Sequence, residues 1–196
     1  MKANRRSGFS LVEMMIALVL LGIVVAKLTI VIDEARDSHG RESARMAIED
    51  RALYVLDQIA YAIMGSDRET LFPDNALPTF TDRLNYKVSL GVEDGEVVWG
   101  DPEVIALSAD GTSVYWAENE GLANQRLVTW ANNVSELLEL ELLNTADDNA
   151  NGLTDESGLH FVVDRSSVTI RLTLTGEDSS GDMINHTVET VVTCRN

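Results

Sequence analysis

Cysteine, proline and basic residues are scarce in this sequence, and each shortage excludes a class of protein. The single cysteine, Cys194, cannot form an intrachain disulfide or hold a zinc ion by itself. Lysine and arginine together number 15, against 32 aspartates and glutamates. The resulting formal net charge of −17 repels a phosphate backbone, so no nucleic-acid partner is expected. The first proline is Pro73, which leaves everything before it free of helix breakers.

Catalytic motifs of fixed spacing are also missing. The sequence has no GxSxG, HExxH, GxGxxG, Walker A or CxxC pattern, the arrangements that place a nucleophile, a metal or a phosphate. The three histidines stand in a polar helical stretch and in two strand-like runs, where packed or solvated side chains are expected (His39, His160 and His186). The sequence therefore predicts neither catalytic residues nor an organic cofactor. We expect that the protein is not an enzyme.

What the chain does have is a long apolar segment near its start. Three basic residues, Lys2, Arg5 and Arg6, precede a run from Phe9 to Ala26, and the apolar character continues to Ile32. At about 1.5 Å per residue, a helix over 9–32 is long enough to cross a hydrocarbon core of about 30 Å. Basic residues before the run place the N-terminus in the cytoplasm and the rest of the chain on the other side of the membrane.

Two ordinary interpretations of this segment leave features unexplained. It could be a cleaved secretory signal peptide, with Val24 and Ala26 as the small residues before the cut, or a plain signal anchor. Neither accounts for Glu13, because a carboxylate inside an apolar helix costs about 2.5–3.5 kcal/mol at the bilayer centre. Neither accounts for the Gly8-Phe9 junction, which comes before the apolar run rather than after it.

The segment from Arg5 to Glu13, RRSGFSLVE, resembles the class III signal of type IV prepilins and type II secretion pseudopilins. That signal has a short basic leader, a glycine, an N-terminal Phe or Met, and Glu at the fifth mature position before about twenty apolar residues. The resemblance implies a leader at 1–8, which a prepilin peptidase removes between Gly8 and Phe9 before methylating the new amine of Phe9. It implies that Glu13 neutralises the amine of a neighbouring subunit. It also implies an inner-membrane protein whose globular domain is periplasmic and whose partners are other pilin or pseudopilin subunits.

Residues 33–64 are expected to continue the helix beyond the membrane. They contain no proline, and one apolar stripe recurs at helical spacing (Ile48, Ala52, Val55, Leu56, Ile59 and Ile63). Such a stripe suits packing on a sheet. Residues 36–45 are polar all round, which indicates solvated helix between the membrane and the domain.

After Gly65 the charge and the periodicity both change. Residues 1–64 carry eight acidic and eight basic side chains, whereas residues 65–196 carry 24 acidic and seven basic ones. The segment from Asp74 to Thr81 is expected to be a connecting loop. Short apolar or alternating runs separated by turn residues predict strands at Leu84–Leu90, Glu96–Trp99, Val104–Leu107, Ser113–Glu118, Gln125–Trp130, Val134–Leu142, Leu159–Val163, Ser167–Thr175 and Asn185–Thr193. Antiparallel strands against one long helix make an α+β, pilin-like fold over 65–196.

One acidic stretch resembles half of a calcium-binding loop. Residues 147–152, DDNANG, follow the pattern D-x-[DN]-x-[DN]-G, although Gly158 stands where an EF-hand has its closing Glu. The candidate calcium ligands are side-chain or main-chain oxygens of Asp147, Asn149, Asn151, Leu153, Asp155 and Glu156. The same residues also suit an ordinary polar hairpin loop, so both interpretations stand.

Together these patterns predict a structural subunit. The expected function is that of a minor pseudopilin or minor pilin, most like a J-type pseudopilin or a PilW-like minor pilin, assembled through its N-terminal helix. The alternative is a membrane-anchored envelope module or enzyme that only carries an anchor and forms no filament.

Overall fold

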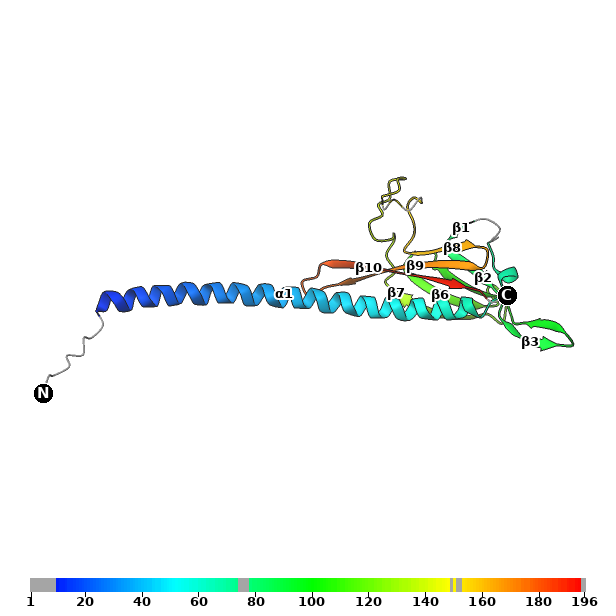
Figure 1. Ribbon diagram of the computed structural model, residues 1–196, viewed down its shortest axis with the longest axis horizontal. Coiled ribbons are helices and arrows are strands. Elements are labelled where there is room, and N and C mark those ends of the chain that lie inside the picture. The colour runs from blue at the N-terminus through cyan, green and yellow to red at the C-terminus, as the bar shows by residue number, and fades with distance from the viewer. Residues whose placement is uncertain (1–9, 74–77, 149, 151–152, 195–196) are drawn as a thin grey trace. The chain divides into compact units, whose positions relative to one another are not determined.

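The computed structural model describes residues 10–73, 78–148, 150 and 153–194 (Figure 1). Within them the longest element is the helix α1, Leu11–Met64, which has 54 residues. The chain divides into two compact units, residues 1–42 and residues 43–196.

The first unit contains the N-terminal part of α1. Its apolar side chains from Leu11 to Ile32 are all about half exposed or more, so this segment has no core of its own. By length and composition α1 is a helix that could cross a membrane. The polar stretch that follows is solvated, and Arg36 lies 4.0 Å from Asp33, one helical turn away.

The second unit begins with residues 43–64 of α1, where the predicted apolar stripe is confirmed. Ala52, Val55, Leu56, Ile59 and Ile63 are all buried, and Ile48 is half-buried against the same core. The helix ends at Met64, where the hydroxyl of Ser66 donates to the carbonyl of Ile63 at 2.6 Å. A single turn of 3-10 helix, η1 (Arg68–Thr70), follows.

The rest of this unit consists of antiparallel strands, as the sequence predicted. The strands described are β1 (Thr79–Thr81), β2 (Arg83–Tyr86), β3 (Ser89–Glu93), β4 (Glu96–Trp99), β5 (Glu103–Leu107), β6 (Ser113–Glu118), β7 (Arg126–Asn132), β8 (Leu159–Asp164), β9 (Ser167–Glu177) and β10 (Met183–Thr193). One sheet has the order β1-β8-β9-β10 and a second has the order β2-β5-β6-β7, while β3 and β4 pair only with each other. The result is an α+β fold with a pilin-like arrangement.

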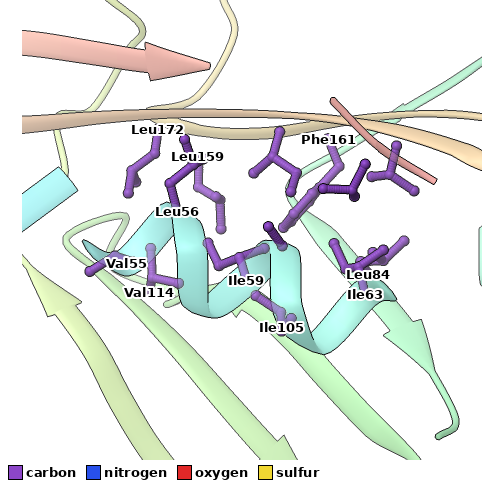
Figure 2. Packing of buried hydrophobic residues seen from close by; sticks show 14 of the residues in the cluster. Val55, Leu56, Ile59, Ile63, Leu84, Ile105, Val114, Leu159, Phe161 and Leu172 are labelled. Atoms are coloured by element: carbon purple, nitrogen blue, oxygen red, sulfur yellow. The ribbon is translucent and has the colours of Figure 1, made fainter. Parts of the chain in front are cut away.

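The core forms where α1 meets both larger sheets. Figure 2 shows Leu56 pointing toward Leu159 and Leu172, whereas Ile59 and Ile63 point toward residues of β2 and β5. Ile59 and Ile63 are completely buried. One helical stripe therefore links two sheets that share no strand pairing.

Two strand predictions and one loop prediction were wrong in detail. The segment Val134–Leu142 makes only isolated bridges, at Val134 and Leu137, because its backbone turns at Leu140, where φ is 73°. Thr79–Thr81, expected in a loop, instead pairs with β8 as a short edge strand. The run Leu84–Leu90 belongs to two sheets, since β2 ends at Tyr86 and β3 begins at Ser89.

Gly158 holds the segment after β7 against the sheet. Its amide donates to Glu136, and its carbonyl accepts a 2.7 Å hydrogen bond from Thr173 of β9. A Cβ at this position would lie 2.0 Å from the carbonyl oxygen of Ser135. The backbones at 135 and 158 are therefore too close for any side chain between them.

We expect Gly158→Ala to lower the free energy of unfolding by about 1–3 kcal/mol, the usual cost of overpacking. Thermal unfolding of the purified protein measures this. Gly65→Ala is the matched control, because its Cβ would meet its nearest neighbour, the carbonyl oxygen of Ala62, at an ordinary 3.4 Å. Equal melting temperatures for the two variants would contradict the close packing at Gly158.

Candidate functional site

The first turn of α1 is held by two reciprocal hydrogen bonds. The amide of Ser10 donates to Oε2 of Glu13 at 2.9 Å, and the amide of Glu13 donates to Oγ of Ser10 at 3.3 Å. This is a capping box, in which each side chain satisfies an amide that the helix itself leaves unpaired. The sequence signal for it, S-x-x-E over residues 10–13, was present but was not used in the prediction.

The capping box gives Glu13 a role within its own chain. Its negative charge lies at the N-terminus of α1, where the helix dipole favours an anion. Glu13 is exposed, and so are the apolar side chains of Val12 and Met14 beside it. The carboxylate is thus presented in an apolar setting, and among the described residues it is held by the first turn. Gly8 and Phe9, the predicted cleavage site, lie outside the described residues.

A comparison with protein families identifies the same N-terminal segment. Residues 3–26 match the family model described as the prokaryotic N-terminal methylation motif. The match covers the Gly8-Phe9 junction, Glu13 and most of the apolar run. A long N-terminal helix packed on antiparallel sheets is a pilin-like arrangement, and the chain carries the class III signal of type IV pilins and pseudopilins. No curated protein and no solved structure matches the chain.

The motif and the apolar helix both fit anchoring in a membrane. The family defined by this motif is structural rather than enzymatic. Processing by a prepilin peptidase and assembly with other pilins are what the motif implies for its bearers.

The predicted calcium loop is only partly described. Asn149, Asn151 and Gly152 lie outside the described residues. Within the described part, Asp155 folds the loop back on itself, since Oδ1 accepts hydrogen bonds from the amides of Asn144 and Thr145 at 2.9 and 3.1 Å. Asp148 does the same for the amide of Leu142. These carboxylates cap the backbone turns of the loop.

Three of the candidate calcium ligands line an open pocket of about 620 Å³ between this loop and the edge of the sheet. The lining includes Leu153, Asp155 and Glu156 of the loop, together with Asp82 and His160. Among residues 10–73, 78–148, 150 and 153–194, no three His, Cys, Asp or Glu side chains gather closely enough to hold a metal ion. The calcium loop therefore stays a prediction.

His160 of β8 is buried. The sequence predicted its strand but not the side chains around it. Its ring stacks on Phe80 of β1, with centroids 6.0 Å apart, and burial lowers the pKa of His160 below its usual value. Its partner in the register of β9 is Arg171. The guanidinium of Arg171 bonds Glu189 at 2.5 Å and lies 3.9 Å from the buried Glu156. Register across three strands, which no local pattern reports, brings these groups together.

The calcium prediction has a direct test. A weak extracellular-type site has a Kd of about 10⁻⁴–10⁻³ M. Calcium at ten times that Kd stabilises the folded state by about 1.4 kcal/mol. We therefore expect millimolar Ca²⁺ to raise the melting temperature relative to EDTA, and Asp147→Ala to abolish the rise. Asp164→Ala, an exposed acid outside the loop, is the control. Equal melting temperatures of the wild type in calcium and EDTA would reduce the stretch to a polar loop.

Proposed function

We propose that this protein is a minor subunit of a filament of the type IV pilus or type II secretion pseudopilus kind. The observation that carries the proposal is the junction of a class III signal with an apolar helix that has no core of its own. Apolar side chains half exposed over two dozen residues need either lipid or other helices around them. The membrane supplies lipid before assembly, and the filament core supplies neighbouring helices after it.

The proposed processing begins at the leader. A prepilin peptidase cleaves between Gly8 and Phe9 and methylates the amine of Phe9. The chain then spans the inner membrane once, with its N-terminus at the cytoplasmic face and residues 65–196 in the periplasm. Lys2, Arg5 and Arg6 before the apolar run support this orientation, because short cytoplasmic segments are the ones enriched in Lys and Arg.

Assembly is proposed to depend on a change of partner for Glu13. In the single chain its carboxylate accepts from the amide of Ser10, one residue after the new amine of Phe9. In a bundle of such helices, the carboxylate would pair with the ammonium group of an adjacent subunit. A buried carboxylate is costly alone and tolerable when it is paired, so this pairing would favour the assembled state over the separate chain.

Within the family we propose a minor rather than a repeating subunit, of the J type or the PilW-like type. The support is the length of 196 residues and the acidic loop that follows the segment 134–142. Glu13 sets the chain apart from the minor pseudopilins that lack this glutamate. Its filament partners would be other pilin or pseudopilin subunits.

The decisive measurement is the intact mass of the protein extracted from membranes of the cell that makes it. We expect a chain that begins at Phe9 and is one methyl group heavier than the unmodified sequence from that residue. Gly8→Leu is the control variant, which we expect to retain its full leader. A wild-type chain starting at Lys27, as for a secretory signal peptide, or retaining Met1, would favour an anchored module outside any filament.

A further inference from the structure

The β3–β4 hairpin lies apart from the two larger sheets. Figure 1 shows it projecting from the domain, and among the strands that the structure describes, β3 and β4 pair only with each other. Every residue of β3 is exposed. A two-stranded hairpin is at best marginally stable in water without a further surface to pack on. The Asp94-Gly95 turn, with positive φ at both residues, suits a tight hairpin and fixes its register.

This hairpin is apolar on its exposed sides. Val92 pairs across the strands with Val97, and their side chains are 67% and 45% exposed, while Leu90 next to them is 71% exposed. Single exposed apolar residues are normal, but three on eleven residues of hairpin form a concentrated patch.

The patch continues onto the end of α1. Tyr61, Met64 and Val88 line one hollow there, and Val92, Val97 and Trp99 line a second, with Gly65 at the edge of both. Tyr61 is 79% exposed and Met64 is 46% exposed. We define the hairpin surface as six apolar residues of these hollows and of the hairpin: Tyr61, Met64, Val88, Leu90, Val92 and Val97.

The charged residues of the hairpin itself, residues 89–99, are all acidic. Glu93, Asp94 and Glu96 surround its tip, Asp67 lines the second hollow, and residues 89–99 contain no lysine or arginine. Residues 65–196 contain only seven basic residues against 24 acidic ones. Three of these basic side chains are already in ion pairs with glutamates (Arg83, Arg126 and Arg171).

We propose that the hairpin surface docks a second protein, whose contact area is apolar at its centre and carries Lys or Arg at its rim. The apolar centre covers the valines and Leu90, and the basic rim faces Glu93, Asp94 and Glu96. Charge complementarity favours such a protein over the other possible binding partners. Another copy of this acidic domain brings like charges to the contact, and so do the anionic headgroups of a bilayer. A basic-rimmed protein brings the opposite sign.

The proposal stands on the hairpin surface and does not depend on the class III signal. A photoreactive amino acid at position 92 of the full chain, expressed in the cell that makes it, is the probe. We expect an adduct with a different protein, and we expect the linked peptide, sequenced by mass spectrometry, to have apolar residues flanked by Lys or Arg. The same probe at Leu127, an exposed residue of β7, is the control and should give no such adduct.

Charge reversal completes the test. The triple variant Glu93→Lys, Asp94→Lys and Glu96→Lys should reduce the adduct at position 92 about tenfold, since like charges across an interface oppose association. Glu136→Lys, Asp164→Lys and Glu177→Lys change the net charge equally at exposed sites elsewhere and should leave the adduct intact. Melting temperatures confirm that both triple variants fold.

Four results would overturn the proposal. They are an adduct with a second copy of the chain, an adduct with lipid, no adduct at position 92 above the Leu127 control, and an adduct equally strong in both triple variants. Because none of these outcomes involves Glu13 or cleavage at Gly8, the hairpin surface and the proposed filament function can fail separately.

Discussion

Replacing Glu13 with glutamine should leave cleavage of the leader unchanged and reduce incorporation into filaments by about a hundredfold or more. Glutamine keeps a side-chain oxygen that can accept from the amide of Ser10, so the first turn of α1 keeps its cap. What the change removes is the charge. If the carboxylate pairs with a neighbour's amine in a dry helix bundle, the variant leaves that ammonium unpaired. The cost is about 3–5 kcal/mol, and each 1.4 kcal/mol is tenfold in affinity.

Two further variants separate the charge from the cap. Glu13→Ala removes both and should assemble as poorly as Glu13→Gln. Ser10→Ala removes the acceptor for the amide of Glu13 and keeps the carboxylate. It costs about 0.5–2 kcal/mol of helix stability, and we expect it to assemble nearly as well as the wild type. The measurement is the ratio of processed subunit in sheared filaments to processed subunit in the membrane fraction.

Normal incorporation of Glu13→Gln alongside a defect in Ser10→Ala would show that the glutamate acts only as a helix cap. A subunit at the very tip of a filament has no neighbour above it, so one of the two amine–carboxylate contacts is missing there. Such a subunit should tolerate Glu13→Gln better than a repeating one does. The size of the defect therefore also bears on the proposed minor role.

The features that could be predicted from the sequence are those that depend on a local pattern within one segment of the chain. The apolar run, the stripe from Ala52 to Ile63, and the alternation of Val168, Ile170 and Leu172 each follow one local period, and the structure has all three. The turn at Asp94-Gly95 has a local rule as well. The first turn of α1 was equally predictable, because S-x-x-E is a local signal.

The features that escaped prediction depend on segments far apart in the chain. Thr79–Thr81 becomes a strand only because β8, eighty residues later in sequence, offers an edge. The segment 134–142 has strand-like leucines, yet Leu138 is buried while Leu140 and Leu142 are exposed, since Gly158 and Thr173 fix its path. His160, Arg171 and Glu189 meet through strand register alone. The calcium loop stays a prediction, because the spacing of its candidate ligands is local, whereas a convergence of their oxygens would depend on the path of the whole loop.

Residues 33–196 should form a soluble, folded monomer, whereas residues 66–196 should not fold. The reason is that the core residues of α1 lie between the two larger sheets and provide their common apolar partner (Figure 2). Without them, Leu159 and Leu172 on one sheet and Ile105 on the other lose their cover, and all three are fully buried in the structure. Removing 1–32 takes away the exposed apolar segment and leaves this core intact. Circular dichroism and size-exclusion chromatography of the two fragments measure the difference.

A single substitution in residues 33–196 makes the same argument quantitative. Ile59 is completely buried between the two sheets, so Ile59→Ala should cost about 2–5 kcal/mol of unfolding free energy. Tyr54 lies on the same helix and is 64% exposed, so Tyr54→Ala should change stability by only about 0.5 kcal/mol. Urea unfolding of both variants provides the comparison. Folding of residues 66–196, or similar costs for the two alanines, would mean that the sheets pack on each other without the helix.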